Sequence, residues 1–159
     1  MIIRIADIIQ ESFVDGAGIR CAIFFQGCNR NCRGCHNPQT HDLNGGYVMD
    51  TGEIIKLFRA DALITGITLT GGEPLLQIPA AIDLARAAKR LCLNVWCYTG
   101  YTYENLPSDA QPLMQFVDVL VDGAYQEEER DLSLLFRGSK NQRVIDLNRT
   151  RAENHIVLW

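Results

Sequence analysis

The sequence predicts an α/β protein, folded as a partial, open barrel of about five or six mostly parallel strands. Apolar runs with strand character alternate along the chain with segments of helical periodicity, and this alternation is typical of a parallel sheet covered by helices. The 159 residues fall short of the roughly 200 to 250 residues that a closed eight-stranded α/β barrel requires. No repeat, linker or low-complexity tract divides the chain, so we expect one domain over residues 1–159.

The first half of the chain supplies two expected strands and one helix. Residues 19–25 form a short apolar run, rich in residues that favour strands, which ends at a Gln-Gly pair. Asp50 is expected to begin a helix, because the acidic residue Glu53 follows it by three positions. Residues 67–70 form the next expected strand, which leads directly into a glycine pair.

The second half continues the same alternation. In residues 78–91 the apolar side chains recur at helical spacing while charged side chains occupy the other side, which predicts an amphipathic helix. Residues 94–98 are an expected strand, and the continuous apolar run at 117–121 is typical of a buried parallel strand. A last strand is expected near residues 144–147.

Composition and charge exclude some classes of function. The formal charge of −4 argues against broad binding of nucleic acid, which depends on clustered Lys and Arg. No apolar run approaches the ~20 residues needed to span a membrane. Arg4 and Asp7 interrupt the apolar N-terminus, unlike the apolar core of a signal peptide. We therefore expect a cytoplasmic protein whose thiols stay reduced.

Three of the six cysteines are isolated in the sequence. Cys21, Cys92 and Cys97 each stand in apolar surroundings without another cysteine at a metal-binding spacing. A free cysteine in such a setting behaves as a small hydrophobic residue. We therefore expect all three to be buried and to have no role in chemistry.

Cys28, Cys32 and Cys35 follow the first expected strand at the spacing C-x3-C-x2-C, which suits a short loop wrapped around one inorganic centre. A [4Fe–4S] site for electron transfer has four thiolates. This loop offers three, so a cluster bound here would keep one iron open for a substrate. The alternative is a tetrahedral zinc site with His36 or His41 as the fourth ligand, although zinc sites favour paired C-x2-C units.

A glycine pair followed by an acid ends the expected strand at residues 67–70. Gly71 and Gly72 allow a ligand to approach the backbone closely, and we expect a side chain at Gly72 to obstruct that ligand. Glu73 can accept a hydrogen bond from an ammonium group, and Pro74 suits the first turn of the following helix. Alone, this G-G-E-P segment is also compatible with an ordinary strand-to-helix turn.

Together, the cysteine loop and the G-G-E-P turn resemble the radical S-adenosylmethionine superfamily. The resemblance implies that the three loop cysteines hold a [4Fe–4S] cluster whose open iron binds the amino and carboxylate groups of S-adenosylmethionine. It also implies that the G-G-E strand end holds the amino group, and that residues 1–159 form a single domain of this superfamily. Many members carry an aromatic residue where this chain has Gly34. The backbone of Gly34, Cys35 and His36 is then expected to contact the adenine.

Four further segments extend the resemblance over most of the chain. They are residues 14–20 (VDGAGIR), 96–101 (WCYTGY), 119–123 (VLVDG) and 131–143 (DLSLLFRGSKNQR). The first looks like the opening motif of glycyl-radical-enzyme activating enzymes, with Ala17 where those usually carry proline. The other three are similar to segments of the activating proteins of anaerobic ribonucleoside-triphosphate reductase.

This resemblance implies an oxidoreductase that reductively cleaves S-adenosylmethionine to a 5′-deoxyadenosyl radical and generates a glycyl radical on the reductase. An electron donor such as a flavodoxin is then required. We expect Thr99 and Asp122 near the ligand, since the carboxyl ends of strands form the active face of α/β barrels. No side chain is expected to act as an acid or base, because the cofactor supplies the reactivity. An open barrel edge would admit a loop of a large protein substrate.

Two other functions remain open at this point. A radical enzyme that acts on a small molecule, such as 7-carboxy-7-deazaguanine synthase, would share both the cysteine loop and the glycine turn. A zinc-binding or electron-transfer module without enzymatic activity would need the cysteine loop alone.

Overall fold

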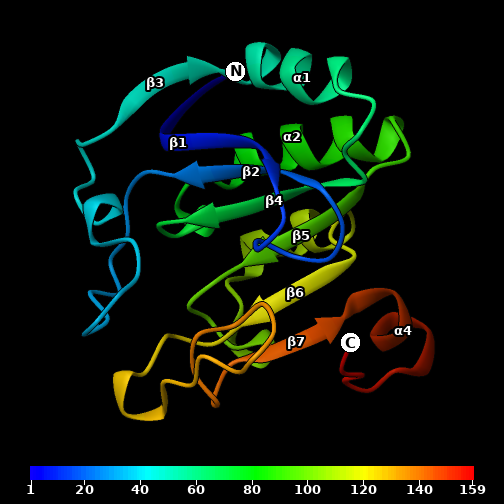
Figure 1. Ribbon diagram of the computed structural model, residues 1–159. Helices are drawn as coiled ribbons and strands as arrows, with labels where there is room; N and C mark the ends of the chain where they lie inside the picture. Colours follow the sequence, from blue (N-terminus) through cyan, green and yellow to red (C-terminus); the bar gives the residue numbers. More distant parts are fainter.

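One seven-stranded sheet organises the chain, which the computed structural model describes over residues 1–159 (Figure 1). The strands lie in the order β3-β1-β2-β4-β5-β6-β7. Four central strands pair in parallel: β2 (Arg20–Phe25), β4 (Gly66–Gly71), β5 (Asn94–Tyr98) and β6 (Val119–Asp122). The outer pairings are antiparallel and involve β1 (Ile2–Ser12), β3 (Tyr47–Asp50) and β7 (Arg143–Asp146). Because β3 and β7 form separate edges, the sheet is open.

The predicted α/β class is confirmed, but the sheet differs from the prediction in two respects. It has seven strands rather than five or six, and three of its six strand pairings are antiparallel. The additional strands are β1 and β3. In β1 only Ile3, Ile5 and Ser12 are buried, and the four-residue β3 has no fully buried residue. Such short or largely exposed strands give little apolar alternation in the sequence.

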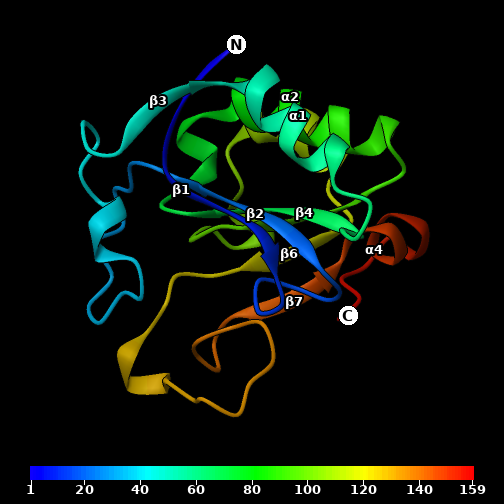
Figure 2. The same ribbon diagram turned by 45° about the horizontal axis from the view of Figure 1, so that its top comes forward.

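Helices cover one face of the sheet. Figures 1 and 2 show α1 (Thr51–Ala60) and α2 (Ile78–Arg90) side by side above the strands. The short α3 (Gln111–Met114) packs against α2, and α4 (Leu147–Glu153) follows β7. Short 3₁₀ turns lie at Pro38–Thr40, Pro74–Leu76, Tyr103–Asn105, Ser108–Ala110 and Glu127–Glu129. None of the helices is long and apolar enough to cross a membrane.

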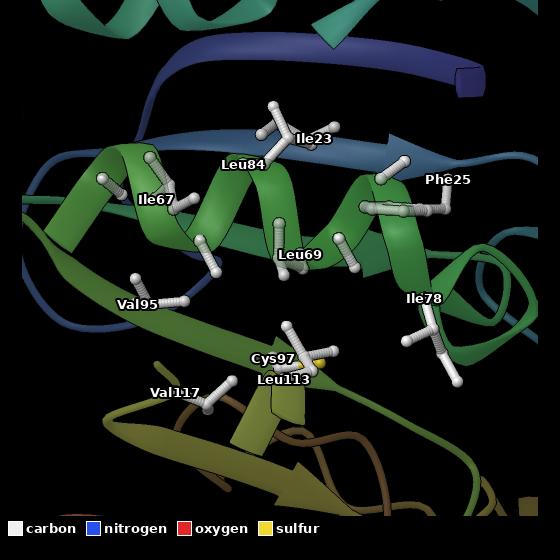
Figure 3. Close-up of a cluster of buried hydrophobic side chains, with 14 of the residues drawn as sticks. Ile23, Phe25, Ile67, Leu69, Ile78, Leu84, Val95, Cys97, Leu113 and Val117 are labelled. Atoms are coloured by element: carbon white, nitrogen blue, oxygen red, sulfur yellow. The ribbon is translucent and has the colours of Figure 1, made fainter. Parts of the chain in front are cut away.

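The main core lies between the sheet and the helices. Alternate side chains of the central strands, among them Ile23, Leu69 and Cys97, lie on the side of the sheet that α2 covers, in one buried cluster with Leu84 of that helix (Figure 3). Strand residues alternate between the two faces, so the intervening side chains reach the opposite face. On that face Trp96, Val119 and Val121 form a second, smaller cluster. The sheet thus separates a large apolar core from a second face that is available for a binding site.

Most of the predicted elements are confirmed near their predicted bounds. The strand expected at residues 94–98 coincides with β5, and the helix expected at 78–91 is α2. Asp50 is the N-cap of α1, where its side chain accepts a hydrogen bond from the backbone N–H of Gly52. The last expected strand is β7, shifted by one residue.

The isolated cysteines only partly follow the prediction. Cys21 and Cys97 are buried in the main core, as expected. The prediction for Cys92 is wrong, because this residue is exposed. It lies just beyond the end of α2 with a positive φ of 59°, where the chain turns away from the core and directs the side chain to solvent.

Candidate functional site

A cavity of about 540 Å³ lies at the carboxyl-terminal ends of the central parallel strands, a volume typical of small-molecule sites. Its walls come from the loop after β2, the ends of β4 and β5, and the segment after β6. Among the lining residues are Cys28, Arg30, Cys32, Cys35, His36, Gly71, Gly72, Glu73, Tyr98, Thr99, Gly100, Tyr125 and Phe136. Tyr98 and Trp96 share the face of β5 that points away from the helices. The cavity therefore opens on the face opposite α1 and α2.

The loop after β2 brings Cys28, Cys32 and Cys35 to this cavity, and all three are half-buried. The base of the loop is closed by backbone hydrogen bonds from the N–H of Gly27 to the carbonyl of Thr40, at 2.8 Å, and from Cys28 to His41, at 3.3 Å. The buried side chain of Gln26 donates to two further carbonyls of the loop, at 2.7 and 3.1 Å. The sequence thus fixes both ends of the cysteine loop, so that its three thiols face one space.

Burial raises the pKa values of the Cys28 and Cys32 thiols. Thiolates are the form that binds iron, so metal binding must release these protons. At the third cysteine, the N–H of Asn37 donates a hydrogen bond to the Cys35 sulfur at 3.4 Å.

No three His, Cys, Asp or Glu side chains gather closely enough to coordinate one metal ion. The tetrahedral Cys3His zinc site is thus not formed in the structure. His36 instead packs its ring against Tyr125, with 4.9 Å between ring centroids, and His41 does not line the cavity. A [4Fe–4S] cluster makes a different demand, because each thiolate binds a different iron and the sulfurs stand apart around the cluster.

The glycine pair at the end of β4 fits tightly against the chain itself. A Cβ at Gly72 would lie 2.3 Å from the carbonyl oxygen of Gly27, and a Cβ at Gly71 would lie 2.7 Å from the backbone of Phe24. Backbone hydrogen bonds of 2.8 Å join Gly72 to Phe25 and Glu73 to Gly27. A side chain at Gly72 would therefore also meet the backbone that leads into the cysteine loop, a contact that the sequence did not predict.

Glu73 is 1% exposed and joins the ends of two strands. Its carboxylate accepts hydrogen bonds from the Thr99 hydroxyl at 3.0 and 3.1 Å, from the N–H of Gly100 at 2.9 Å and from the N–H of Leu75 at 3.1 Å. Burial raises the pKa of Glu73, against the effect of these hydrogen bonds and of the nearby Arg30 charge. Each carboxylate oxygen thus accepts from the Thr99 hydroxyl and from one backbone N–H, which holds Glu73 in a fixed orientation at the cavity wall.

Two of the predicted site residues lie outside the cavity lining. A Cβ at Gly34 would meet the side chain of Glu127, at 2.8 Å, in an exposed segment. Asp122 is fully buried, but Arg143 on the neighbouring strand forms an ion pair with its carboxylate, which also accepts from the N–H of Tyr103 at 2.8 Å. The carboxylate of Asp122 is thus held by a partner 21 residues later in the chain, and its contact with a ligand stays a prediction.

The segment after β6 closes one side of the cavity and is held by Gln142. The side-chain oxygen of Gln142 accepts from the N–H groups of Gly138, at 2.9 Å, and Ser139, at 3.2 Å. Its side-chain nitrogen donates to the carbonyl of Gly123 at 3.0 Å. Phe136 of this segment lines the cavity and packs edge-on against Trp96 and Trp159, with ring centroids 5.2 and 5.7 Å away.

Sequence reasoning missed two groups of cavity residues. Arg30 lies between two of the loop cysteines, and its Nε and Nη2 atoms are buried without a hydrogen-bond partner. At the mouth, four apolar side chains are strongly exposed: Phe13 at 65%, Val14 at 76%, Leu132 at 82% and Leu135 at 73%. A cation inside the cysteine motif and an apolar cluster in residues 131–143 were the available signals.

Thiols, an acid and an unpaired guanidinium in one cavity fit an iron–sulfur cluster together with a zwitterionic ligand.

Comparison with known proteins assigns the chain to a family. The sequence model of the 4Fe-4S single cluster domain matches residues 14–145. The anaerobic ribonucleoside-triphosphate reductase-activating protein of Vibrio cholerae is 36% identical over 137 residues, which cover 81% of this chain and 88% of that protein. The chain belongs to this activating-protein family. Proteins of the same name from Escherichia coli K12 and Enterobacteria phage T4 are 34% and 33% identical, covering 81% and 83% of this chain and 89% and 86% of theirs.

Membership in the activating-protein family agrees with the resemblance found in the sequence. The region matched by the 4Fe-4S domain, residues 14–145, begins at the VDGAGIR motif and includes the cysteine loop, the glycine turn and the segment after β6.

Arg20, at the end of the VDGAGIR motif, is a buried structural residue. Its guanidinium donates to Thr68 at 2.7 Å and to the carbonyls of Ile67 at 2.6 Å and Asn94 at 3.1 Å, and burial lowers its pKa to about 10.

Proposed function

We propose that this protein binds a [4Fe–4S] cluster through Cys28, Cys32 and Cys35, and that it activates an anaerobic ribonucleoside-triphosphate reductase by generating a glycyl radical on it. The observation that carries this proposal is the shared cavity, which both the three cysteines and the Gly71-Gly72-Glu73 strand end line. When bound, the reduced cluster supplies the electron that cleaves S-adenosylmethionine to a 5′-deoxyadenosyl radical, which takes a hydrogen atom from the target glycine.

The residues of the chain bind and orient. Glu73, braced by Thr99 and Gly100, lines the cavity and would hold the amino group of S-adenosylmethionine. Cys35 and His36 line the cavity, where they border the adenosyl part. No side chain needs to transfer a proton, because the target loses a hydrogen atom rather than a proton.

The exposed mouth of the cavity supports a protein substrate. A small-molecule enzyme usually encloses its ligand, whereas the apolar side chains at this mouth stand in solvent. Exposed apolar clusters of this kind are typical of contact surfaces for other proteins. We regard the open sheet as a partial barrel in a single domain of residues 1–159, whose open side admits the glycine-bearing segment of the reductase. The relatives reported above give no support to a small-molecule substrate.

The cellular setting follows from this chemistry. The cluster needs an electron for each cleavage, so the protein requires a reduced donor such as a flavodoxin. Free thiols and an iron–sulfur cluster suit a reducing compartment, and we place the protein in the cytoplasm.

Anaerobic reconstitution tests the proposal. The protein should bind about four iron and four sulfide per chain, and the electron paramagnetic resonance signal of the reduced cluster should change when S-adenosylmethionine is added. With the reductase present, 5′-deoxyadenosine should be released and a glycyl radical should appear on the reductase. Replacement of the target glycine by alanine should abolish that radical.

Matched cysteine variants provide the control. Cys28→Ala, Cys32→Ala or Cys35→Ala should each abolish the cluster, whereas Cys92→Ala, at an exposed site outside the cavity, should leave it intact. One zinc per chain without iron uptake would contradict the cluster. Conversion of a small metabolite with the reductase left free of radical would contradict the target.

A further inference from the structure

Arg30 is a cation held inside the candidate cofactor cavity. It follows Cys28 and precedes Cys32 in the cysteine loop, and it lines the same cavity as these residues. Its guanidinium lies over the ring of Tyr101, 3.7 Å from the ring centroid. The Arg30 stem packs against Gly100, where a Cβ would lie 3.0 Å from Arg30 Cγ. The side chain is therefore fixed in place by the turn after β5.

The guanidinium of Arg30 has no protein partner for its buried donors. Its Nε and Nη2 atoms are buried without a hydrogen bond, and no carboxylate lies within ion-pair distance. Arg20 and Arg143, which are also partly or fully buried, direct their donors to carbonyl or carboxylate oxygens. Buried donors without partners are costly, the more so on a charged group. Arg30 is thus arranged for an acceptor that the protein itself does not provide.

The surroundings identify the kind of acceptor. A guanidinium presents two parallel N–H groups that match the two oxygens of a carboxylate. Glu73 lies close enough for the Arg30 charge to act on it, yet the two do not pair, and its carboxylate is already braced by Thr99 and Gly100. A cation and an anion held apart on one cavity suit the two charged groups of an α-amino acid.

We propose that Arg30 binds the α-carboxylate of S-adenosylmethionine, while Glu73 holds its amino group. This inference rests on the proposed function, because it concerns the same cavity and cofactor. The competing role for Arg30 is to act on the cluster, by donating to its sulfurs and shifting its reduction potential. The two roles differ in what they require of the ligand.

The test compares two ligands on the reconstituted, anaerobic protein. Arg30→Gln should weaken the binding of S-adenosylmethionine about tenfold or more, as expected for loss of a charge-assisted pair. Its affinity for decarboxylated S-adenosylmethionine should stay within about twofold of the unmutated protein. Arg33→Gln is the matched control: this arginine of the same loop has an 84% exposed side chain, and its replacement should change neither affinity.

The outcomes separate the alternatives. Equal weakening for both ligands, or a shifted reduction potential with unchanged affinity, would overturn the carboxylate assignment. If the Arg30→Gln variant takes up less than a full complement of iron, the same comparison of ligands is made with the Arg30→Lys variant. That variant keeps the charge but loses the paired donors, and the inference then requires weaker binding of the carboxylated ligand alone. Failure of the unmutated protein to bind S-adenosylmethionine would instead overturn the proposed function.

Discussion

Gly72 shows how one missing side chain can join two motifs. Its place is set by the carbonyl oxygen of Gly27, which a Cβ would approach to 2.3 Å. Gly27 directly precedes Cys28, so the glycine turn and the cysteine loop are in contact through their backbones. The two motifs that predicted the function in the sequence are thus one structural unit.

Gly72→Ala should lower the stability of the protein by about 1–3 kcal/mol, the usual range for overpacking, and should also lower its iron content. The displaced backbone would lose the hydrogen bonds that Gly72 and Glu73 make to β2 and the cysteine loop. Chemical denaturation and iron analysis after reconstitution measure the two effects.

Gly52→Ala is the control for this substitution. A Cβ at Gly52 would meet only Oδ1 of Asp50, at 2.8 Å, and Gly52 does not line the cavity. Because this oxygen caps α1, its displacement should cost about 1 kcal/mol of stability, but the variant should keep its iron. Full iron content in Gly72→Ala would show that the contact does not hold the cysteine loop.

The sequence could predict which side chains share the site where their spacing along the chain is short and regular. The spacing of Cys28, Cys32 and Cys35 was enough to expect their thiols in one loop, and the structure brings all three to one cavity. The environment of Asp122 was not predictable, because it depends on Arg143, which pairs with it only after β7 docks beside β6. The partnerless donors of Arg30 likewise emerge only from the packed turn around it.

At the scale of elements, Arg143 fastens three of them together. From β7 it forms ion pairs with Asp122 of β6 and with Glu104, in the turn after β5. Both oxygens of Glu104 accept from this guanidinium, at 3.0 and 2.7 Å. Hydrogen bonds from Arg143 lower the pKa of Glu104 to about 2.

This pairing predicts a loss of stability in acid. A carboxyl group whose pKa is lower in the folded state stabilises the protein above its unfolded pKa. That contribution is lost as pH falls from about 4.5 toward 2. Glu104→Gln should therefore reduce the fall in the urea midpoint of the cluster-free protein between pH 5 and pH 2. Because Glu104 is half exposed, solvent screening keeps the effect to about 1 kcal/mol or less.

Glu128→Gln serves as the comparison for Glu104→Gln. Glu128 is an exposed residue of the acidic turn and forms no ion pair. Its variant should keep the pH dependence of the unmutated protein. Identical slopes in the two variants would show that the Arg143 pair does not contribute to folding.

Elements with clear periodicity were the predictable ones. The buried strands β4, β5 and β6 and the amphipathic α2 follow from apolar spacing alone. The antiparallel β1 and β3 were not predicted, because much of their surface is exposed and their pairing joins residues far apart in the chain, such as Ile3 and Met49. Long-range pairing leaves little trace in local sequence.

At the scale of the whole molecule, the positions of the exposed apolar residues indicate where a protein substrate docks. Leu132 and Leu135 stand at the cavity mouth, while Leu63, which is 62% exposed, lies in the turn before β4, at the opposite end of that strand. If the reductase docks at the mouth, only the first two leucines become buried in the complex.

The double variant Leu132→Ser/Leu135→Ser should raise the KM for the reductase about tenfold or more, since each buried leucine contributes roughly 1.5–3 kcal/mol. Its iron content and its affinity for S-adenosylmethionine should not change. Leu63→Ser should leave all three quantities unaltered. A normal KM in the double variant would place the docking surface elsewhere.

The aromatic contact of Phe136 has an optical consequence. The chain contains two tryptophans, and both Trp96 and Trp159 pack against this one ring of the cavity wall. The tryptophan rings also touch each other, at 5.2 Å between centroids. All of the intrinsic tryptophan fluorescence of the protein therefore originates beside the segment that borders the site. If that segment moves when a ligand binds, the tryptophan emission should change, and no added label is required to measure it.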